Sequence, residues 1–248
     1  DPARRTVDAM LLDKLQEPFR SVLARVRRSV ALRAERGWRV ALLGGAVRDL
    51  VTGRQPHDLD FVLEGVEDKN ALHAWATLLD DESRVTVTGF GGLRFEVDGE
   101  QVDAWRVEDN AIGAGPGRQH ETFASVLAGG VTLTTDACAV VLGATPTDDV
   151  ECTSHLLHAL ERGEVGIVSS SRLMPTIVLA RAAKACVDLK LRPGPSLVAF
   201  ATANQAVGNI SFEVALEHHR ADMTPAQARE VLGMEPARVR PRRVVRNA

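Results

Sequence analysis

The stretch VALLGGAVRDLVTGRQPHDLDFVLE, residues 40–64, decides the fold. It predicts a short apolar strand, a Gly44-Gly45 turn, one or two helical turns, a polar loop, and a second strand that opens with Asp58-Leu59-Asp60. Residues i and i+2 of a strand point to the same face, so Asp58 and Asp60 can converge on one cation while Leu59 faces the core. Two neighbouring carboxylates suit magnesium better than zinc.

The glycine pair leaves the backbone without side chains just where residues 46–50 are predicted to start a helix. Backbone amides and the positive end of that helix can therefore face a phosphate. A triphosphate that bridges the glycines and the metal is the ligand this arrangement predicts. Taken separately, a Gly-Gly turn also fits an ordinary tight turn, and paired aspartates also fit a solvated surface. Their order along the chain is what favours nucleotide binding.

These residues resemble a known family. The pattern GGxVRDxLxGRxxxDxD is the signature of the class II tRNA nucleotidyltransferases and bacterial poly(A) polymerases, members of the polymerase beta-like nucleotidyltransferase superfamily. The strong match covers about a tenth of the chain, and a weaker one extends to about Arg181. The signature is met at Gly44, Gly45, Val47, Arg48, Asp49, Gly53, Arg54, Asp58 and Asp60.

The resemblance implies an α+β fold, a nucleotidyltransferase head with a mixed sheet and flanking helices, followed by a small helical neck. The residues agree, since a strand pair is followed by a helical pattern over 69–80 and by a hairpin whose Asp98-Gly99 turn suits positive φ angles. We expect an N-terminal helical segment over 1–37, the head over 38–170, the neck over 171–235 and a basic tail over 236–248.

A third carboxylate is expected on the hairpin. Val102 and Ala104 alternate with Asp103, which therefore belongs to the face opposite Val102. The superfamily carries its third carboxylate on a strand near this point, which favours Asp103, with Glu96 and Glu108 as lesser candidates. A merely exposed hairpin carboxylate fits Asp103 equally well.

The resemblance then assigns roles. Asp58, Asp60 and Asp103 would hold two magnesium ions, one lowering the pKa of an acceptor hydroxyl and one neutralising the leaving pyrophosphate. Asp49 is expected to cap or pair locally. The substrate would be an NTP, with ATP or CTP favoured. The residues expected to contact it are Gly44, Gly45, Arg48, Arg54 and Arg181.

The sequence also departs from the family. Residues 120–141 lie in the place of the segment RRDFTINALAY, which helps to recognise ribose and phosphates, but both arginines are missing. Either Arg118 or Arg94 substitutes for them, or the nucleotide is held differently. Residues 109–119, rich in glycine, are expected to form a mobile loop like the one linked to nucleotide addition in the family.

The largest departure is in the predicted helix 172–189. Its Arg181-Ala182 resembles the RA of the family's EDPLRILRAVRF, whose acidic and first basic residues pair with the edges of CTP and ATP. Leu173-Met174 and Ile177 or Val178 stand near those positions. Apolar side chains cannot make these hydrogen bonds, so ordered CCA addition is not expected.

Composition limits the remaining possibilities. The net charge of −3 leaves RNA binding to a local patch, and the arginines of the tail supply one. Three scattered cysteines favour reduced thiols, and together with the lack of a long apolar run or a signal peptide they predict a cytoplasmic protein without membrane contact. The family's long C-terminal body, which holds tRNA, is expected to be truncated to roughly a head and a neck. The oligomeric state is not indicated.

Three functions follow. The first is a nucleotidyltransferase whose acceptor is an RNA 3′ end, tRNA or another RNA. The second keeps the catalytic head but modifies a protein hydroxyl or another nucleotide, as small conflict-system enzymes do. The third is a catalytically silent RNA- or protein-binding relative. Asp58 and Asp60 argue against the third, because clustered carboxylates are costly to keep together without a cation.

Overall fold

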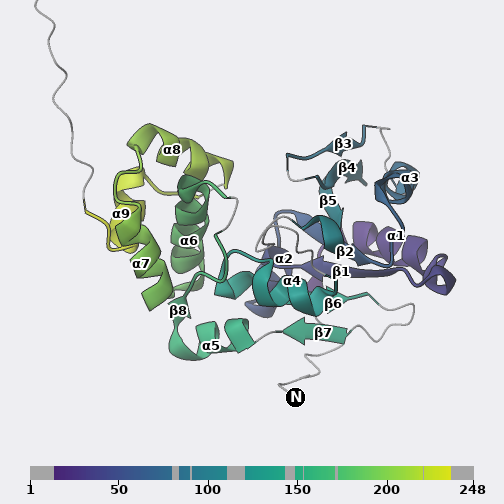
Figure 1. Ribbon diagram of the computed structural model, residues 1–248, viewed down its shortest axis with the longest axis horizontal. Helices are drawn as coiled ribbons and strands as arrows, with labels where there is room; N and C mark the ends of the chain where they lie inside the picture. The colour runs from purple at the N-terminus through teal and green to yellow at the C-terminus, as the bar shows by residue number, and fades with distance from the viewer. Residues whose placement is uncertain are drawn as a thin grey trace, which may run out of the picture. The chain divides into compact units, whose positions relative to one another are not determined.

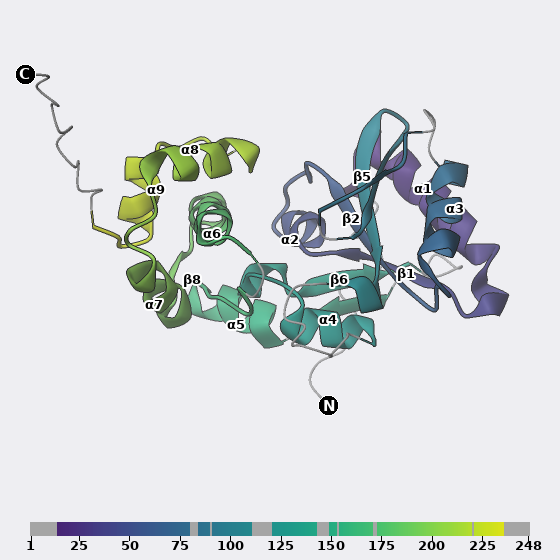
Figure 2. The same ribbon diagram turned by 45° about the horizontal axis from the view of Figure 1, so that its top comes forward.

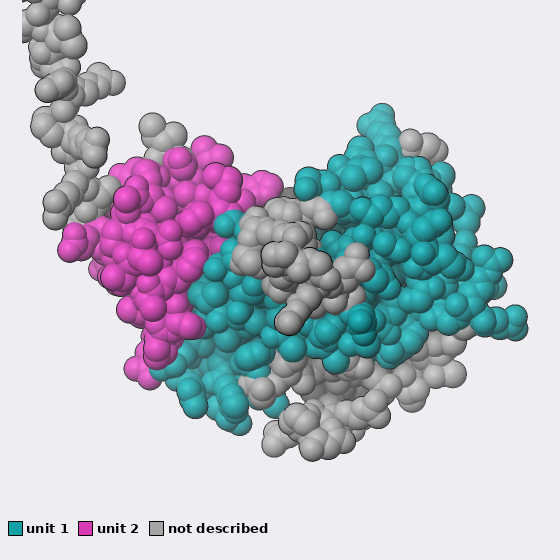
Figure 3. Space-filling model, in the orientation of Figure 1, with its two compact units in different colours: residues 1–173 teal, residues 174–248 magenta. Residues whose placement is uncertain are grey.

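The computed structural model describes residues 14–79, 84–89, 91–110, 121–142, 149–152, 154–170, 173–219 and 221–235. The chain forms two compact units, Asp1–Leu173 and Met174–Ala248 (Figure 3). The sequence placed the end of the head a few residues earlier, at 170. None of the helices described is long and apolar enough to cross a membrane.

The first unit is built on a mixed sheet (Figure 1). Its strands are β1 (Arg39–Leu43), β2 (Leu59–Glu64), β3 (Thr86–Val87), β4 (Leu93–Val97), β5 (Glu100–Arg106), β6 (Cys138–Val141) and β7 (Asp149–Cys152). The order across the sheet is β3-β4-β5-β2-β1-β6-β7. The β2–β5 pair is parallel and the other neighbours are antiparallel. The predicted α+β fold with a mixed sheet is confirmed.

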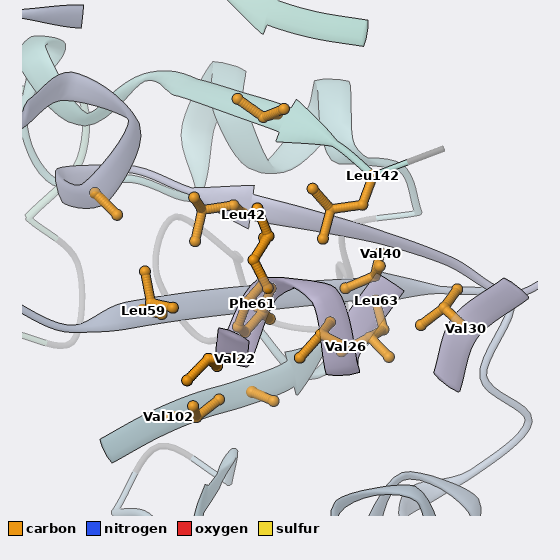
Figure 4. Close-up of a cluster of buried hydrophobic side chains, with 14 of the residues drawn as sticks. Val22, Val26, Val30, Val40, Leu42, Leu59, Phe61, Leu63, Val102 and Leu142 are labelled. Carbon is orange, nitrogen blue, oxygen red and sulfur yellow. The ribbon is translucent and has the colours of Figure 1, made fainter. Parts of the chain in front are cut away.

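Helices cover both faces of this sheet. Those of the first unit are α1 (Phe19–Ala31), α2 (Gly45–Val51), α3 (Lys69–Leu79), α4 (Phe123–Gly129) and α5 (Ser154–Arg162), with a further short strand, β8 (Glu164–Val165). The helices α1 and α3 lie together, and Val22 and Val26 of α1 share a buried cluster with Phe61 and Val102 of the sheet (Figures 2 and 4). The other face carries Val62, which shares a second cluster with side chains of α4.

The predicted hairpin is present with its turn. Asp98 and Gly99 both have positive φ, 53° and 79°, as a type I′ turn requires. Arg25 of α1 donates to Asp98 Oδ1 at 2.8 Å, which fastens the first helix to the hairpin. The sequence predicts a helical segment over 1–37. The structure has α1 and a 3₁₀ turn, Ala34–Arg36, and residues 1–13 lie outside the described part.

Two strands of the first unit were not predicted from the sequence. Cys138–Val141 is buried at all four positions, so β6 lacks the alternation that marks a half-exposed strand. The other strand, β7, lies at the edge of the sheet. The β6 strand matters for function because it pairs with β1 and thereby brings residues 134–138 beside the glycine turn.

The second unit is helical, as expected for the neck. Its elements are α6 (Pro175–Leu189), the short strand β9 (Arg192–Pro193), α7 (Pro195–Ala203), α8 (Asn209–His218) and α9 (Pro225–Val231). The α9 helix begins with Thr224 as N-cap and Pro225 at the first helical position, a combination that favours a helix start. The α6 helix begins at Pro175, later than the expected 172. The basic tail, 236–248, lies outside the described residues.

Candidate active site

The glycine turn has the bare backbone that the sequence predicts. Gly44 has φ 67° and ψ −120°, a conformation that costs other residues strain, and it is the N-cap of α2. Its amide donates to the Cys138 carbonyl at 2.8 Å, which fixes the turn to β6. A side chain on Gly45 would begin 3.5 Å from Nη2 of Arg48, so the guanidinium lies against the turn.

The carboxylates gather at the same end of the sheet. The β1–β2 ladder pairs Leu42 with Phe61, so the turn that follows β1 and the start of β2 are neighbours. Asp60 is directly opposite Asp103 in the parallel β2–β5 ladder. Asp58 stands in a bend just before β2 and is exposed. The predicted alternation is confirmed, because Leu59 and Val102 are buried in the cluster on the opposite face.

Asp103 already has a cationic partner. Arg94 of β4 donates to both of its oxygens, Nε to Oδ1 and Nη2 to Oδ2, each at 2.7 Å. The hydrogen bonds to Asp103, and the charges of Asp60 and Asp58, raise the pKa of Arg94. Arg94 is therefore hydrogen-bonded to Asp103 and within electrostatic range of Asp60 and Asp58.

A divalent metal would use the same donors. Among the described residues, no three His, Cys, Asp or Glu side chains are close enough together to hold a metal ion. The donor chemistry nevertheless fits magnesium, because Asp60 and Asp103 are hard carboxylates directly opposite each other and Asp58 stands just before β2 at the same end of the sheet. Asp58, Asp60 and Asp103 are the residues that would hold it.

Arg48 is more deeply engaged in the protein than the sequence suggested. Its Nη1 donates to Asp136 Oδ1 at 2.6 Å, and its Nε donates to Asp49 Oδ1 at 2.9 Å. Burial alone would lower the pKa of the guanidinium, but the charges of Asp136 and Asp49 outweigh burial and raise it. Burial raises the pKa of Asp49, and Arg48 offsets only part of that rise. Asp49 thus pairs locally, as predicted, while Arg48 holds α2 to the 3₁₀ turn Thr134–Asp136.

The ion pair between Arg48 and Asp136 is expected to stabilise the folded protein. Replacing Arg48 by methionine is expected to lower the free energy of unfolding by about 3–5 kcal/mol, because the Asp136 side chain, only 4% exposed, loses this guanidinium. Chemical denaturation measures the loss. Arg48→Met combined with Asp136→Asn should recover part of it, since the buried charge of Asp136 is removed together with its partner and only Asp49 keeps its charge. The exposed Arg36→Met is the control, expected to change stability by less than about 0.5 kcal/mol. An Arg48→Met protein of normal stability that loses only NTP affinity would show instead that the guanidinium serves the phosphates.

The other nominated residues lie on separate elements. The amide of Arg54 donates to the Asp49 carbonyl at 2.7 Å, which places Arg54 just after α2, and Arg181 lies on α6 in the second unit. Glu96 is exposed on β4, and Glu108 lies in the 3₁₀ turn after β5. Arg118 and most of the expected mobile loop, residues 111–119, lie outside the described part of the chain.

Two contacts at this end of the sheet were missed from the sequence. The Arg94–Asp103 pair had a signal, since a two-residue turn at Asp98-Gly99 pairs Val97 with Glu100 and, counting outward, Arg94 with Asp103. The Arg48–Asp136 pair had none, because 88 residues separate its members and no local pattern sets their proximity.

Comparison with known proteins supports the fold. No protein-family model and no curated protein matches the chain. A CCA-adding enzyme from Thermotoga maritima, solved in complex with tRNA, matches with a TM-score of 0.66 and 16% identity, over 92% of this chain and 53% of that one. A CCA-adding enzyme in complex with CTP matches with a TM-score of 0.65 and 16% identity, over 92% of this chain and 54% of that one. A CCA-adding enzyme in complex with ATP matches with a TM-score of 0.64 and 14% identity, over 91% of this chain and 53% of that one. The chain thus shares the fold of these enzymes and spans about half of their length.

Proposed function

We propose that the protein is a nucleotidyltransferase, which transfers NMP from an NTP to an acceptor hydroxyl and releases pyrophosphate. The observation that carries the proposal is the meeting of a bare glycine turn with Asp58, Asp60 and Asp103 at one end of the sheet. The turn offers backbone amides to phosphate oxygens, and the three carboxylates offer hard oxygen ligands. The shared fold with enzymes solved with CTP and with ATP supports an NTP as substrate.

The residues of the site would have separate roles in metal binding and in triphosphate binding. Asp58, Asp60 and Asp103 would bind magnesium, which when bound supplies charge neutralisation at the phosphates and a lower pKa for the acceptor hydroxyl. Gly44 and Gly45 allow the triphosphate to approach the backbone. Arg48 keeps that turn in place through Asp136 and stays against Gly45, near enough to favour an anion there. Buried Leu59 and Val102 fix the two strands whose alternate residues present the carboxylates.

The acceptor we propose is an RNA 3′ end, with tRNA first. A solved structure with the same fold is a complex with tRNA. A second candidate is transfer to a protein hydroxyl or to another nucleotide. It is favoured by Met174, which stands 62% exposed at the start of α6 near the position where the family carries a base-pairing acid.

One assay separates these acceptors. The protein is incubated with each labelled NTP and magnesium, with and without total tRNA, and the products are resolved by size. Label in RNA supports the first acceptor, and label in protein or in a small nucleotide supports the second. The double variant Asp58→Asn/Asp60→Asn, purified identically, controls for contaminating transferases. If wild type and the double variant transfer label equally, or neither transfers any, the proposed function is wrong.

A further inference from the structure

Arg94 is bound to the carboxylate cluster in a specific geometry. It lies opposite Asp103 in the β4–β5 ladder, and its guanidinium makes two parallel hydrogen bonds of 2.7 Å, one to each oxygen. This fork is the strong, directional form of an ion pair, in which both oxygens of the carboxylate are engaged at once. A solvated surface arginine does not need this two-bond geometry.

The same guanidinium is within electrostatic range of the whole cluster. Asp103 is paired across the parallel ladder with Asp60, and neighbouring strands lie only ~4.8 Å apart. The charges of Asp60 and Asp58 both act on Arg94. Arg94 therefore balances part of the electrostatic repulsion among the three carboxylates.

We propose that Arg94 is the built-in counter-ion of this cluster, and that a divalent cation must displace it from Asp103 in order to bind. The inference rests on the proposed function, because it takes Asp58, Asp60 and Asp103 as the metal ligands. A metal ion and a guanidinium on the same carboxylate repel each other and compete for the same oxygens. Arg94 is thus a positioning residue that holds Asp103 in place and sets how tightly the metal is bound.

The surroundings allow Arg94 to leave. Its side chain is 46% exposed and Asp103 is 22% exposed, so the guanidinium can swing into solvent without opening a cavity. Its release frees a cation beside the glycine turn's end of the sheet, where a triphosphate is expected. The substitution Arg94→Gln should therefore fold normally, which circular dichroism verifies.

The test measures metal binding without nucleotide or acceptor, so it does not depend on turnover. Manganese binding by electron paramagnetic resonance should be about three- to fivefold tighter in Arg94→Gln than in wild type, the range for losing one partly exposed ion pair. Arg94→Lys, which keeps the charge but loses the fork, should fall between them. Arg39→Gln is the matched control, since Arg39 pairs with Glu64 of β2 at 2.7 Å and is 52% exposed. Its affinity for manganese should equal that of wild type.

A direct readout is the Nε–H signal of Arg94 in nuclear magnetic resonance spectra, identified by its loss in Arg94→Gln. Titration with magnesium should shift this signal toward that of a solvated arginine. Asp58→Asn separates the two proposals. If Asp58→Asn binds manganese as wild type does, or wild type binds none, the metal site and this inference both fail. If Asp58→Asn loses binding while Arg94→Gln gains none and the Nε–H signal does not move, only the role of Arg94 is refuted.

Discussion

Replacing Asp60 by asparagine is expected to slow nucleotide transfer by about three orders of magnitude, because the magnesium ligand that we propose at this position would contribute several kcal/mol to the transition state. The asparagine side chain keeps the shape of aspartate but loses its charge. Asp60 is only half-buried and sits opposite the hydrophobic face, so the free energy of unfolding should change little. Asp58→Asn should have a comparable effect. Initial rates of label incorporation from NTP, with unfolding curves for each variant, measure both quantities.

The same assay identifies the third carboxylate. Asp103→Asn should lose most of the activity, because Asp103 lies in register with Asp60 on the neighbouring strand. Glu96→Gln and Glu108→Gln are the matched controls and should retain activity within a few-fold. Glu96 is opposite Gln101, further along the hairpin, and Glu108 lies beyond the end of β5. Full activity in Asp58→Asn/Asp60→Asn would refute the catalytic assignment, and loss in Glu108→Gln instead of Asp103→Asn would move the third ligand.

The parts of this site that the sequence predicts are those governed by local periodicity. Alternation along β2 and β5 sets which side chains face the core, so the common face of Asp60 and Asp103 follows from two short patterns. The Asp98-Gly99 turn likewise fixes the hairpin. The parallel pairing of β2 with β5 does not follow, because it joins strands separated by α3, β3 and β4, and nothing local selects that neighbour. The β6 strand is buried at every position, so no local pattern predicts it. The ion pair of Asp136 with Arg48 could not be predicted for the same reason.

The choice of base is expected to be weak, and no complete CCA end should be formed. A site that hydrogen-bonds the edge of a base rejects the wrong base by about 10⁴-fold or more, because its buried polar groups would be left unpaired. At the start of α6 this chain offers Met174, 62% exposed, and half-buried Ile177, while Val178 is fully buried. Apolar contacts discriminate by only ~1–3 kcal/mol, or about 10–200-fold. The ratios of kcat/KM among the four NTPs should therefore stay within that range, unless backbone groups and Arg181 select one base.

A tRNA that lacks its CCA end, supplied with CTP and ATP, tests this directly, and efficient synthesis of the full end would refute the argument. Restoring polar groups gives the converse test. Met174→Asp combined with Ile177→Arg places an acidic residue at the N-cap of α6 and a basic residue three positions later, and should sharpen the preference for CTP or ATP. Val187→Asp, a polar change at an exposed apolar position of the same helix, should leave the preference unchanged. If the restored pair changes stability alone, through the better N-cap that aspartate provides, then base selection resides outside α6.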